Sequence, residues 1–550
     1  MLHKIKENRI VIDFLIMFLI AFILIIPMLN KNTDIYFDDG SQHLMRAFGS
    51  YKSIIQNGTD TIISNFANGF GYSWNLFYGP LSEYFIMIMG IFFGSFNFGF
   101  KIAILLIMFA SACMMYKLIF EITENHNTSL LSGIIYITSP YFFTDIYIRH
   151  AIGECMTFIF IPMVALGLYN LFNTEKNHYY LIFGACGLIL SHNIGTVLTA
   201  IFSIIYSLIN FKNLFNTRVK KGLLLDILFI TLITIFFWAP FLETKFSTIY
   251  RCFEDEAMST KESFLSHMIN LKDLFLIQKN SVFVFEIGLP VIMMLIFSFM
   301  TYKRLEENKK EYLFCLFSGI LSVWMATKYF PWKLLPNSFY IIQLPWRMLV
   351  FSTFFFAIIA SINMSVVVRR FNVKDVIIIS IICILYIFSK YEIIVYNNVE
   401  NIEDAQILNI SGHNNEWLPG MGRLEYLPSK AYNNSFYIAT RENGIISLDE
   451  EFEIKNEMKI GNYMTAKIKT KENDVSLELP FIYYPGYLVR FDGIILKTYE
   501  TDKGFLGCTL PRNEDGTLEI NYLGTDILNI SRFISGISFI IFIIYVYKKH

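Results

Sequence analysis

Two adjacent acids, Asp38 and Asp39, stand directly after the first membrane-length apolar run of the chain and before a polar loop. Carboxylates in so apolar a chain need water or a cation to stay ionised. A doublet held at a membrane surface is therefore a candidate general base or metal ligand.

His43 follows the acids by one helical turn. Residues 41–56 predict an amphipathic helix that lies on the membrane and begins after the flexible Gly40. In this arrangement Asp38, Asp39 and His43 could share a divalent cation, Mg²⁺ or Mn²⁺. The alternative is a solvated loop in which the acids only cap the helix N-terminus.

A second charged stretch, residues 147–154, places Arg149 and Glu154 at the mouth of an apolar segment. Arg149 is always charged and could pair with a phosphate group. Glu154 could be its ion-pair partner, a second base or a metal ligand. A structural Arg149–Glu154 pair without any ligand is also consistent with the pattern.

Two further polar residues stand at the ends of apolar runs. His192 separates two such runs and is either a hydrogen-bonded packing residue or a contact to a headgroup or metal. Arg347 opens an apolar run on the side where cations are disfavoured, so an anionic partner such as a lipid-linked phosphate is expected. Simple snorkelling of Arg347 to lipid headgroups is the alternative.

The composition places these residues in a membrane protein. Hydrophobic residues make up 54% of the 550 residues, charged residues only 17%, and the formal net charge is −1. Such a chain is not a soluble enzyme of ordinary composition. The near-neutral charge also argues against nucleic acid as a partner, because phosphate backbones require a basic surface.

Apolar runs long enough to cross the bilayer predict a polytopic helix bundle of about 12 to 13 spans. The runs are 10–29, 102–120, 128–143, 152–172, 179–191, 193–211, 222–242, 282–300, 311–329, 346–367, 375–395 and 528–547. Clusters of Lys and Arg between them fall on one side if the stretch 81–98 dips into the outer leaflet without crossing. This arrangement predicts a multi-pass protein of the bacterial cytoplasmic membrane with both termini cytoplasmic.

Residues 396–527 differ from the rest of the chain. They alternate apolar and polar side chains, with turn signals at 485–486 and 492–493. We therefore expect a transmembrane module over 1–395, with an acidic first external loop at 30–100. An external β-rich domain over 396–527 and a C-terminal anchor at 528–550 would follow.

The motifs taken together resemble a bacterial membrane-protein family named for relation to 6-pyruvoyl-tetrahydropterin synthase and akin to YfhO-like proteins. They are Tyr36-Phe37-Asp38-Asp39-Gly40 with His43, Tyr147-x-Arg149-x-Ala151-x-x-Glu154, Leu190-Ser191-His192, Gln343-Leu344-Pro345-Trp346-Arg347, and Tyr483-Tyr484-Pro485-Gly486-Tyr487 with Asp492-Gly493. Leu344 and Tyr487 depart mildly from the pattern, which more often has phenylalanine and tryptophan there. Zinc histidines and the soluble fold of a pterin-binding enzyme are not in evidence.

This family looks like a branch of the GT-C glycosyltransferases, which take a sugar from polyprenyl phosphate at an external site. The resemblance implies a glycosyltransferase with a polyprenyl-phosphate sugar as donor and an envelope glycan or lipid as acceptor. Catalysis would fall to Asp38, Asp39 and Glu154, and substrate or phosphate binding to the residues His43, Arg149, His192, Gln343 and Arg347. The rival hypotheses are a non-catalytic carrier or flippase and an assembly protein for cell-envelope polymer.

Overall fold

The computed structural model describes residues 2–29, 38–174, 178–254, 259–275, 283–389, 407, 418, 421–449, 451–471 and 473–549. The chain divides into two compact units. Unit 1 comprises residues 1–40, 92–230 and 259–401, and unit 2 comprises residues 41–91, 231–258 and 402–550. Segments 41–91 and 231–258 thus belong with the C-terminal part of the chain, a division that differs from the expected boundary at 395.

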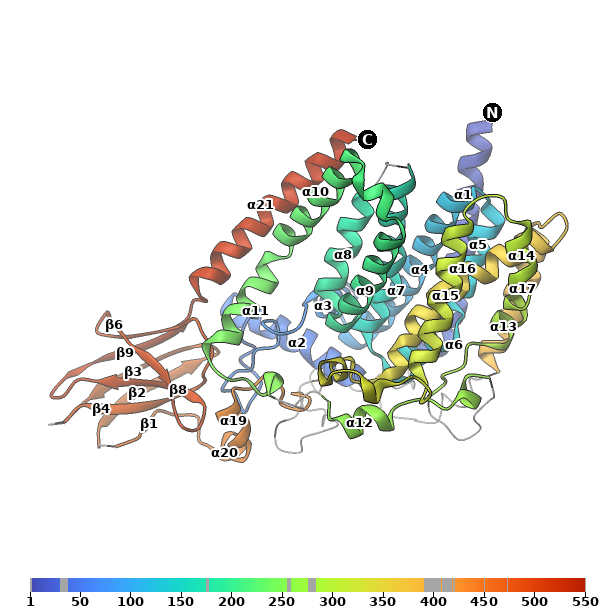
Figure 1. The fold of residues 1–550 in the computed structure, drawn as a ribbon. Coiled ribbons are helices and arrows are strands. Elements are labelled where there is room, and N and C mark those ends of the chain that lie inside the picture. Colours follow the sequence, from blue (N-terminus) through green and yellow to red (C-terminus); the bar gives the residue numbers. More distant parts are fainter. Residues whose placement is uncertain are drawn as a thin grey trace. The chain divides into compact units, whose positions relative to one another are not determined.

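Unit 1 is helical throughout its described residues (Figure 1). Its α-helices are α1 (Leu2–Leu29), α4 (Phe96–Thr123), α5 (His126–Ile137), α6 (Pro140–Thr144), α7 (Ile152–Tyr169), α8 (Tyr179–Ser191), α9 (Asn193–Ile209), most of α10 (Thr217–Ile233), α12 (Lys261–Ser266), α13 (Leu289–Leu295), α14 (Ser298–Arg304), α15 (Lys309–Ala326), α16 (Leu349–Val367) and α17 (Val373–Phe388). Short π or 3₁₀ turns are η1 (Asp145–Arg149), η2 (Asn170–Thr174), η3 (Phe211–Phe215), η5 (Leu271–Leu274), η6 (Trp332–Leu334), η7 (Asn337–Ile342) and η8 (Pro345–Met348).

Fewer helices qualify as membrane spans than the sequence predicts. Within the described ranges, five are long and apolar enough, or six if the bent pair α10 and α11 counts as one. The five are Arg9–Leu29, Phe96–Thr123, Ile152–Thr174, Pro345–Val367 and Asp526–Lys548. The expected count of 12 to 13 is not confirmed, because several apolar runs form short or interrupted helices: the run 282–300, for example, contains α13 and α14.

Glycines allow the helices of unit 1 to approach closely. A Cβ atom at Gly184 of α8 would lie 2.7 Å from the backbone nitrogen of Val164 in α7. Small residues at such contacts are typical of helix packing in membranes, where dispersion contacts replace the hydrophobic effect. Accordingly α7 lies against α8 and α4, and α16 lies against α15 (Figure 1).

Unit 2 contains the strands and several helices. The helices are α2 (Gly40–Asn57, of which Gly40 is counted in unit 1), α3 (Leu81–Phe93), α11 (Ile235–Ser247), α19 (Ser429–Asn433), α20 (Ser435–Thr440) and α21 (Asp526–Lys549), with the 3₁₀ turn η4 (Arg251–Phe253). The expected helix at 41–56 is confirmed as α2, although its residues 41–50 are buried except for the half-buried Gln42, and its position on the membrane stays a prediction. Helix α3 has 13 residues and is too short to cross about 30 Å of hydrocarbon.

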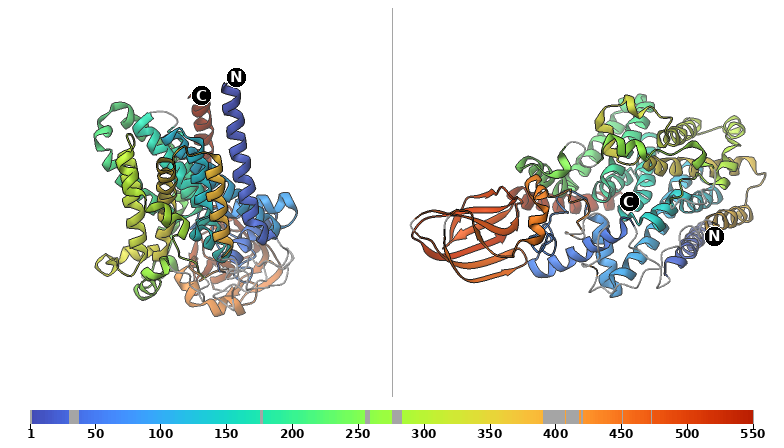
Figure 2. Two further views of the ribbon diagram at one scale, coloured as in Figure 1. Left: turned by 90° about the vertical axis from the view of Figure 1, so that its right-hand side faces the viewer. Right: turned by 90° about the horizontal axis from the view of Figure 1, so that it is seen from below.

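The strands of unit 2 form two antiparallel sheets, drawn in orange and red in Figure 2. One has the order β1-β4-β8-β7 and the other β2-β3-β9-β5-β6. The strands are β1 (Ile446–Ser447), β2 (Glu453–Ile460), β3 (Tyr463–Lys469), β4 (Val475–Ile482), β5 (Tyr487–Phe491), β6 (Ile494–Leu496), β7 (Thr498–Glu500), β8 (Phe505–Leu510) and β9 (Asp515–Tyr522).

In the five-stranded sheet, alternation along β3, β5 and β9 buries one face, as the sequence predicts, whereas β4 and β8 of the other sheet are buried along most of their length. In β9, Leu518 and Ile520 are buried while Glu519 between them is exposed. The turn signal at 492–493 is also confirmed, because Asp492 and Gly493 have φ of 45° and 84° and join β5 to β6 as a two-residue hairpin. The C-terminal region is therefore β-rich, although most of 396–420 lies outside the described residues.

Candidate functional site

Unit 1 brings four acids and two arginines together, and we call this group the acid–arginine cluster. Its members come from the segment after α1, from η1, from the first turn of α7 and from η8: they are Asp38, Asp39, Asp145, Arg149, Glu154 and Arg347. The predicted residues Asp38, Asp39, Arg149, Glu154 and Arg347 thus converge. Asp145, which lies two residues before the charged stretch 147–154, joins them.

Arg149 is at the centre of the cluster. Its Nη1 donates to Asp145 Oδ1 at 2.8 Å and to Glu154 Oε2 at 2.6 Å, and its Nη2 donates to Asp39 Oδ2 at 3.2 Å. Asp38 Oδ2 lies 3.6 Å from Arg149 Nε. Because all three nitrogens already face carboxylates, Arg149 orders the acids more than it offers a site for a further anion.

Glu154 connects the two arginines. Its Oε2 accepts from Arg347 Nε at 3.2 Å in addition to Arg149, while its Oε1 accepts from the Tyr141 hydroxyl at 2.8 Å. The Glu154 side chain is only 2% exposed. Of the roles the sequence left open, the geometry therefore favours an ion-pair partner, since a base must be within reach of substrate.

The aspartates are the accessible part of the cluster. The side chains of Asp38 and Asp39 are 36% and 40% exposed, against 2% for Arg149. Asp39 is fixed twice, because its backbone N–H also donates to the Arg149 carbonyl at 3.0 Å. Asp38 Oδ2 lies farther from Arg149, at 3.6 Å, so this arginine constrains the Asp38 carboxylate less than that of Asp39.

Unusual backbone geometry places these side chains. The chain forms a π turn at Asp145–Arg149, followed by His150 at φ 50°, and Asp38 also has φ 50°. π turns and left-handed non-glycine residues are uncommon and tend to occur where function requires them. The backbone is thus strained in the same short segments that supply the acids and Arg149.

Gln343 occupies a still rarer conformation. It has φ 65° and ψ −50°, and the Leu344 N–H donates across it to the Ile342 carbonyl at 2.8 Å, which makes a strained γ-turn. The turn presents two acceptors to Arg347, whose Nη1 donates to the Ile342 carbonyl at 3.0 Å and to Gln343 Oε1 at 2.7 Å. Arg347 Nη2 has no hydrogen bond among the described residues and is the donor left for a ligand.

Charge balance within the cluster indicates that one acid is neutral. Burial raises the pKa of Asp145 well above its ordinary value, and the negative charge of Glu154 adds to the effect. Glu154 has two arginines beside it, whereas Asp145 shares one nitrogen of Arg149 with it. Asp145 Oδ2 is buried and accepts no hydrogen bond from the described residues, which fits a protonated carboxyl at this position.

His192 faces the same cluster as a neutral ring. Its Nδ1 accepts the Gly195 N–H at 3.0 Å and so caps α9, which assigns the ring proton to Nε2. Burial lowers the pKa of His192 to about 3, and its charge interactions are with Glu154, Arg347, Arg149 and Asp39. Both roles that the sequence left open, helix packing and ligand contact, are compatible with this placement.

His43 has a different partner from the one expected. It lies in unit 2, where its Nδ1 contacts Glu83 Oε1 at 3.1 Å, and Ser82 Oγ donates to Glu83 Oε2 at 2.6 Å. Within the described part of the chain, three or more His, Cys, Asp or Glu side chains are nowhere grouped to hold a metal ion. A metal at Asp38, Asp39 and His43 stays a prediction that these contacts do not support.

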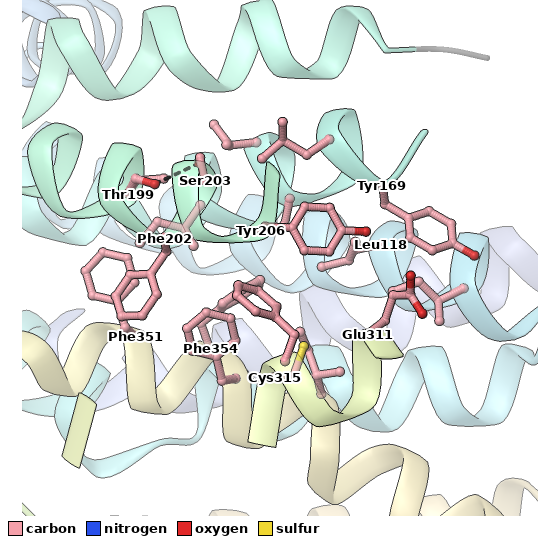
Figure 3. A pocket seen from close by; sticks show the side chains of 18 residues that line it. Leu118, Tyr169, Thr199, Phe202, Ser203, Tyr206, Glu311, Cys315, Phe351 and Phe354 are labelled. Atoms are coloured by element: carbon pink, nitrogen blue, oxygen red, sulfur yellow. Dashed lines mark hydrogen bonds between the residues drawn. The ribbon is translucent and has the colours of Figure 1, made fainter. Parts of the chain in front are cut away.

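An apolar cavity lies near Arg347 within unit 1. Its empty volume is about 610 Å³, and residues of α4, α7, α9, α15 and α16 line it. Figure 3 shows Phe351 at one end and Tyr169 with Glu311 at the other. Phe351 follows Arg347 by four residues, so the apolar lining begins about 6 Å along the helix from the arginine.

Comparison with known proteins agrees with this helical, membrane-embedded arrangement. The sequence model of a membrane-protein family described as the 6-pyruvoyl-tetrahydropterin synthase related domain matches residues 76–394, more than half of the chain. The chain belongs to this family. The 6-pyruvoyl-tetrahydropterin synthase related domain covers Arg149, Glu154 and Arg347, whereas Asp38 and Asp39 precede the match.

The chain is also similar to a curated protein of Lactococcus lactis subsp. cremoris (strain MG1363). This protein carries the description "Uncharacterized protein" and is 27% identical over 287 residues. The aligned region covers 49% of the present chain and 46% of that protein. The chain thus spans less than half the length of that protein. The residues that bear on a reaction are those of the acid–arginine cluster.

Proposed function

We propose that this protein is a membrane glycosyltransferase of the GT-C type that moves a sugar from a polyprenyl-phosphate donor to a cell-envelope glycan or lipid. The observation that carries the proposal is the contact of accessible acids, Asp38 and Asp39, with the buried Arg149–Glu154–Arg347 chain of ion pairs. Such a group combines a base that a reactant can reach with fixed positive charge shielded from water.

Asp38 is our candidate for the base. In the proposed step the acceptor hydroxyl loses its proton to the carboxylate while its oxygen forms a bond to the anomeric carbon of the sugar. The bond between that carbon and the phosphate oxygen breaks, and its electron pair leaves with polyprenyl phosphate. Asp39, which Arg149 holds through both side chain and backbone, would keep the neighbouring carboxylate in place.

The departing phosphate gains negative charge, and Arg347 and His192 are the candidates to stabilise it. Arg347 has Nη2 available, and the neutral His192 carries a proton on Nε2. Arg149, which the sequence suggested for this role, instead pairs with the acids and holds them in position. Donors fixed before the reaction stabilise developing charge without reorganisation, which is the usual source of such rate enhancement.

A lipid-linked donor is supported by the apolar cavity. Its lining begins one helical turn from Arg347 and continues along α16 and α9 (Figure 3). A phosphate at the arginine could therefore be joined to a hydrocarbon chain in the cavity, whereas a water-soluble sugar nucleotide would leave this surface uncovered. The same features would serve a carrier that binds the lipid phosphate without chemistry, so this remains the alternative.

The remaining elements of the proposal follow from the predicted orientation. The acid–arginine cluster would lie at the outer face of a bacterial cytoplasmic membrane, with both chain termini in the cytoplasm. The β-rich region would bind the acceptor outside. A divalent cation, if one takes part, would need oxygen ligands from the donor phosphate in addition to Asp38 and Asp39.

Transfer in membrane vesicles tests the proposal. Vesicles that contain the wild type or the Asp38→Asn, Asp39→Asn or doubly substituted protein would receive undecaprenyl phosphate carrying a radiolabelled sugar. We expect the wild type to release polyprenyl phosphate, Asp38→Asn to lose at least about 100-fold in rate, and the control Asp502→Asn, an exposed acid of unit 2, to match the wild type. Equal rates for the wild type and the double variant would reject catalysis by this pair, and binding without release would favour the carrier.

A further inference from the structure

A long groove on the surface of unit 1 lies between α9 and α15. It is lined by Ile205 and Ile209 of α9 and by α15 residues from Lys309 to Trp324, and its empty volume is about 1400 Å³. The sixteen residues from Lys309 to Trp324 are fifteen helical steps, or about 22 Å of helix. The groove is therefore longer than the roughly 15 Å of hydrocarbon in one leaflet of a bilayer.

The groove is lined by apolar side chains along most of its length and by two lysines at one end. Phe317, Ile320 and Trp324 are 64%, 52% and 45% exposed, which leaves a large apolar surface on a helix that also packs against the candidate span α16. The charged residues that line the groove are Lys309 and Lys310. Both are exposed, and Lys310 Nζ is fixed by Asn210 Oδ1 at 2.5 Å.

The described acids near the lysines do not line the groove. Glu311, the next residue of α15, lines the interior cavity and not the groove. Phe314 lines both spaces and so forms a shared wall between them. The groove therefore combines an apolar channel with two cations at one end, which is the pattern that a lipid with an anionic headgroup requires.

We propose that this groove binds an anionic phospholipid, whose acyl chain lies along α15 and whose phosphate contacts Lys309 and Lys310. The chain would cover Phe317 and Ile320, and its far part would pack beside Trp324. This site is separate from the proposed transfer reaction and does not depend on it. Two cations at one end favour a headgroup with net negative charge over a zwitterionic one, since each lysine near an anionic lipid contributes about 1 kcal/mol, or roughly fivefold in affinity.

Native mass spectrometry of the purified full-length protein tests the headgroup. Detergent solutions would contain phosphatidylglycerol or phosphatidylcholine with identical acyl chains. We expect phosphatidylglycerol to remain bound to the wild type and to Lys309→Arg/Lys310→Arg, and its affinity to fall about 25-fold in Lys309→Gln/Lys310→Gln. The matched control is Lys303→Gln/Arg304→Gln, which removes two exposed cations of α14 that do not line the groove.

Trp324 reports on the acyl chain. Phosphatidylglycerol with brominated chains should quench the part of the tryptophan fluorescence that disappears in Trp324→Phe, and the Lys309→Gln/Lys310→Gln variant should lose this quenching. The proposal is overturned if both lipids are retained equally, if the α14 control loses lipid as strongly as the groove variant, or if Trp324 is not quenched. A dimer that Phe317→Arg dissociates would identify a second copy of the chain as the occupant and would also reject the lipid.

Discussion

Two buried ion-pair groups, one in each unit, differ in how completely their hydrogen bonds are made. In unit 2, Glu478 of β4 accepts from Arg441 Nε and the Tyr437 hydroxyl with one oxygen and from Thr501 with the other. Arg441 uses its remaining nitrogens on backbone carbonyls, including that of Gly444. This pair is satisfied within the fold and needs no ligand.

The acid–arginine cluster of unit 1 is not satisfied in this way. It contains four acids but only two arginines. Among the described residues, Asp145 Oδ2 accepts no hydrogen bond and Arg347 Nη2 donates none. Two of its residues, Asp145 and Arg149, come from a π turn and Arg347 donates to a γ-turn, whereas Glu478 lies on a strand. The comparison indicates that Arg441–Glu478 stabilises the fold, and that the unit 1 cluster is arranged for a ligand at a cost in strain.

The largest effect is expected when one arginine is removed from each group. Arg441→Met leaves Glu478 buried without a counter-ion, which should cost about 3–5 kcal/mol of stability. Arg149→Met removes the cation that four acids share and leaves Glu154 with Arg347 alone. Arg149→Met should be the worse of the two, because more acids depend on Arg149. Thermal unfolding of the full-length protein in detergent measures this, with the exposed Arg490→Met as control. An Arg441→Met protein as stable as that control would contradict the assigned role.

Replacing both partners sharpens the comparison. Arg441→Met/Glu478→Leu should recover most of the stability that Arg441→Met loses, because a well-packed apolar pair can replace a buried ion pair. Arg149→Met/Glu154→Leu should not recover it, since the aspartates and Arg347 would remain uncompensated. Equal recovery of unfolding temperature in both double variants would mean that the two groups do not differ.

A smaller, pH-dependent effect is expected at Asp145. Its pKa is raised in the folded protein, mainly by burial, so between its ordinary value of 3.8 and the raised value the folded state binds the extra proton. Stability should therefore fall as the pH rises from 3.8 through that window. Asp145→Asn should remove this slope and be nearly neutral at acid pH. An unfolding temperature of the variant that follows the wild type at every pH would contradict the assignment.

The smallest effect concerns the γ-turn at Gln343. Gln343→Gly and Gln343→Ala both remove the amide contact to Arg347, but only glycine adopts φ 65° without strain. The glycine variant should therefore be more stable than the alanine variant by about 1 kcal/mol. The difference between their unfolding temperatures isolates the backbone term, and an alanine variant of equal stability would show that the turn is not strained.

The sequence predicted the members of the site better than their roles. Charges in an otherwise apolar chain pointed to Asp38, Asp39, Arg149, Glu154 and Arg347, because such residues need partners. The spacing of Asp145 and Arg149, four residues apart, was the available signal for the further acid.

The remaining details depend on tertiary structure. The γ-turn at Gln343 and the contact of His43 with Glu83, which lies 40 residues away along the chain, are fixed by packing that local patterns do not encode. The β-rich region was predictable from alternation because one face of β3, β5 and β9 is buried. The sequence predicted more membrane spans than there are described helices long and apolar enough to cross a membrane. Apolar runs do not reveal breaks such as that between α13 and α14.

Phe314 gives the membrane-facing part of unit 1 a property of its own. Its ring lines the interior cavity and the surface groove alike, so a single side chain is a partition between two apolar compartments. Truncation to alanine is expected to open the wall that Phe314 forms between the two spaces. A void lined by hydrocarbon side chains fills with hydrocarbon in preference to water, and the merged space would admit chains sideways from the surrounding leaflet.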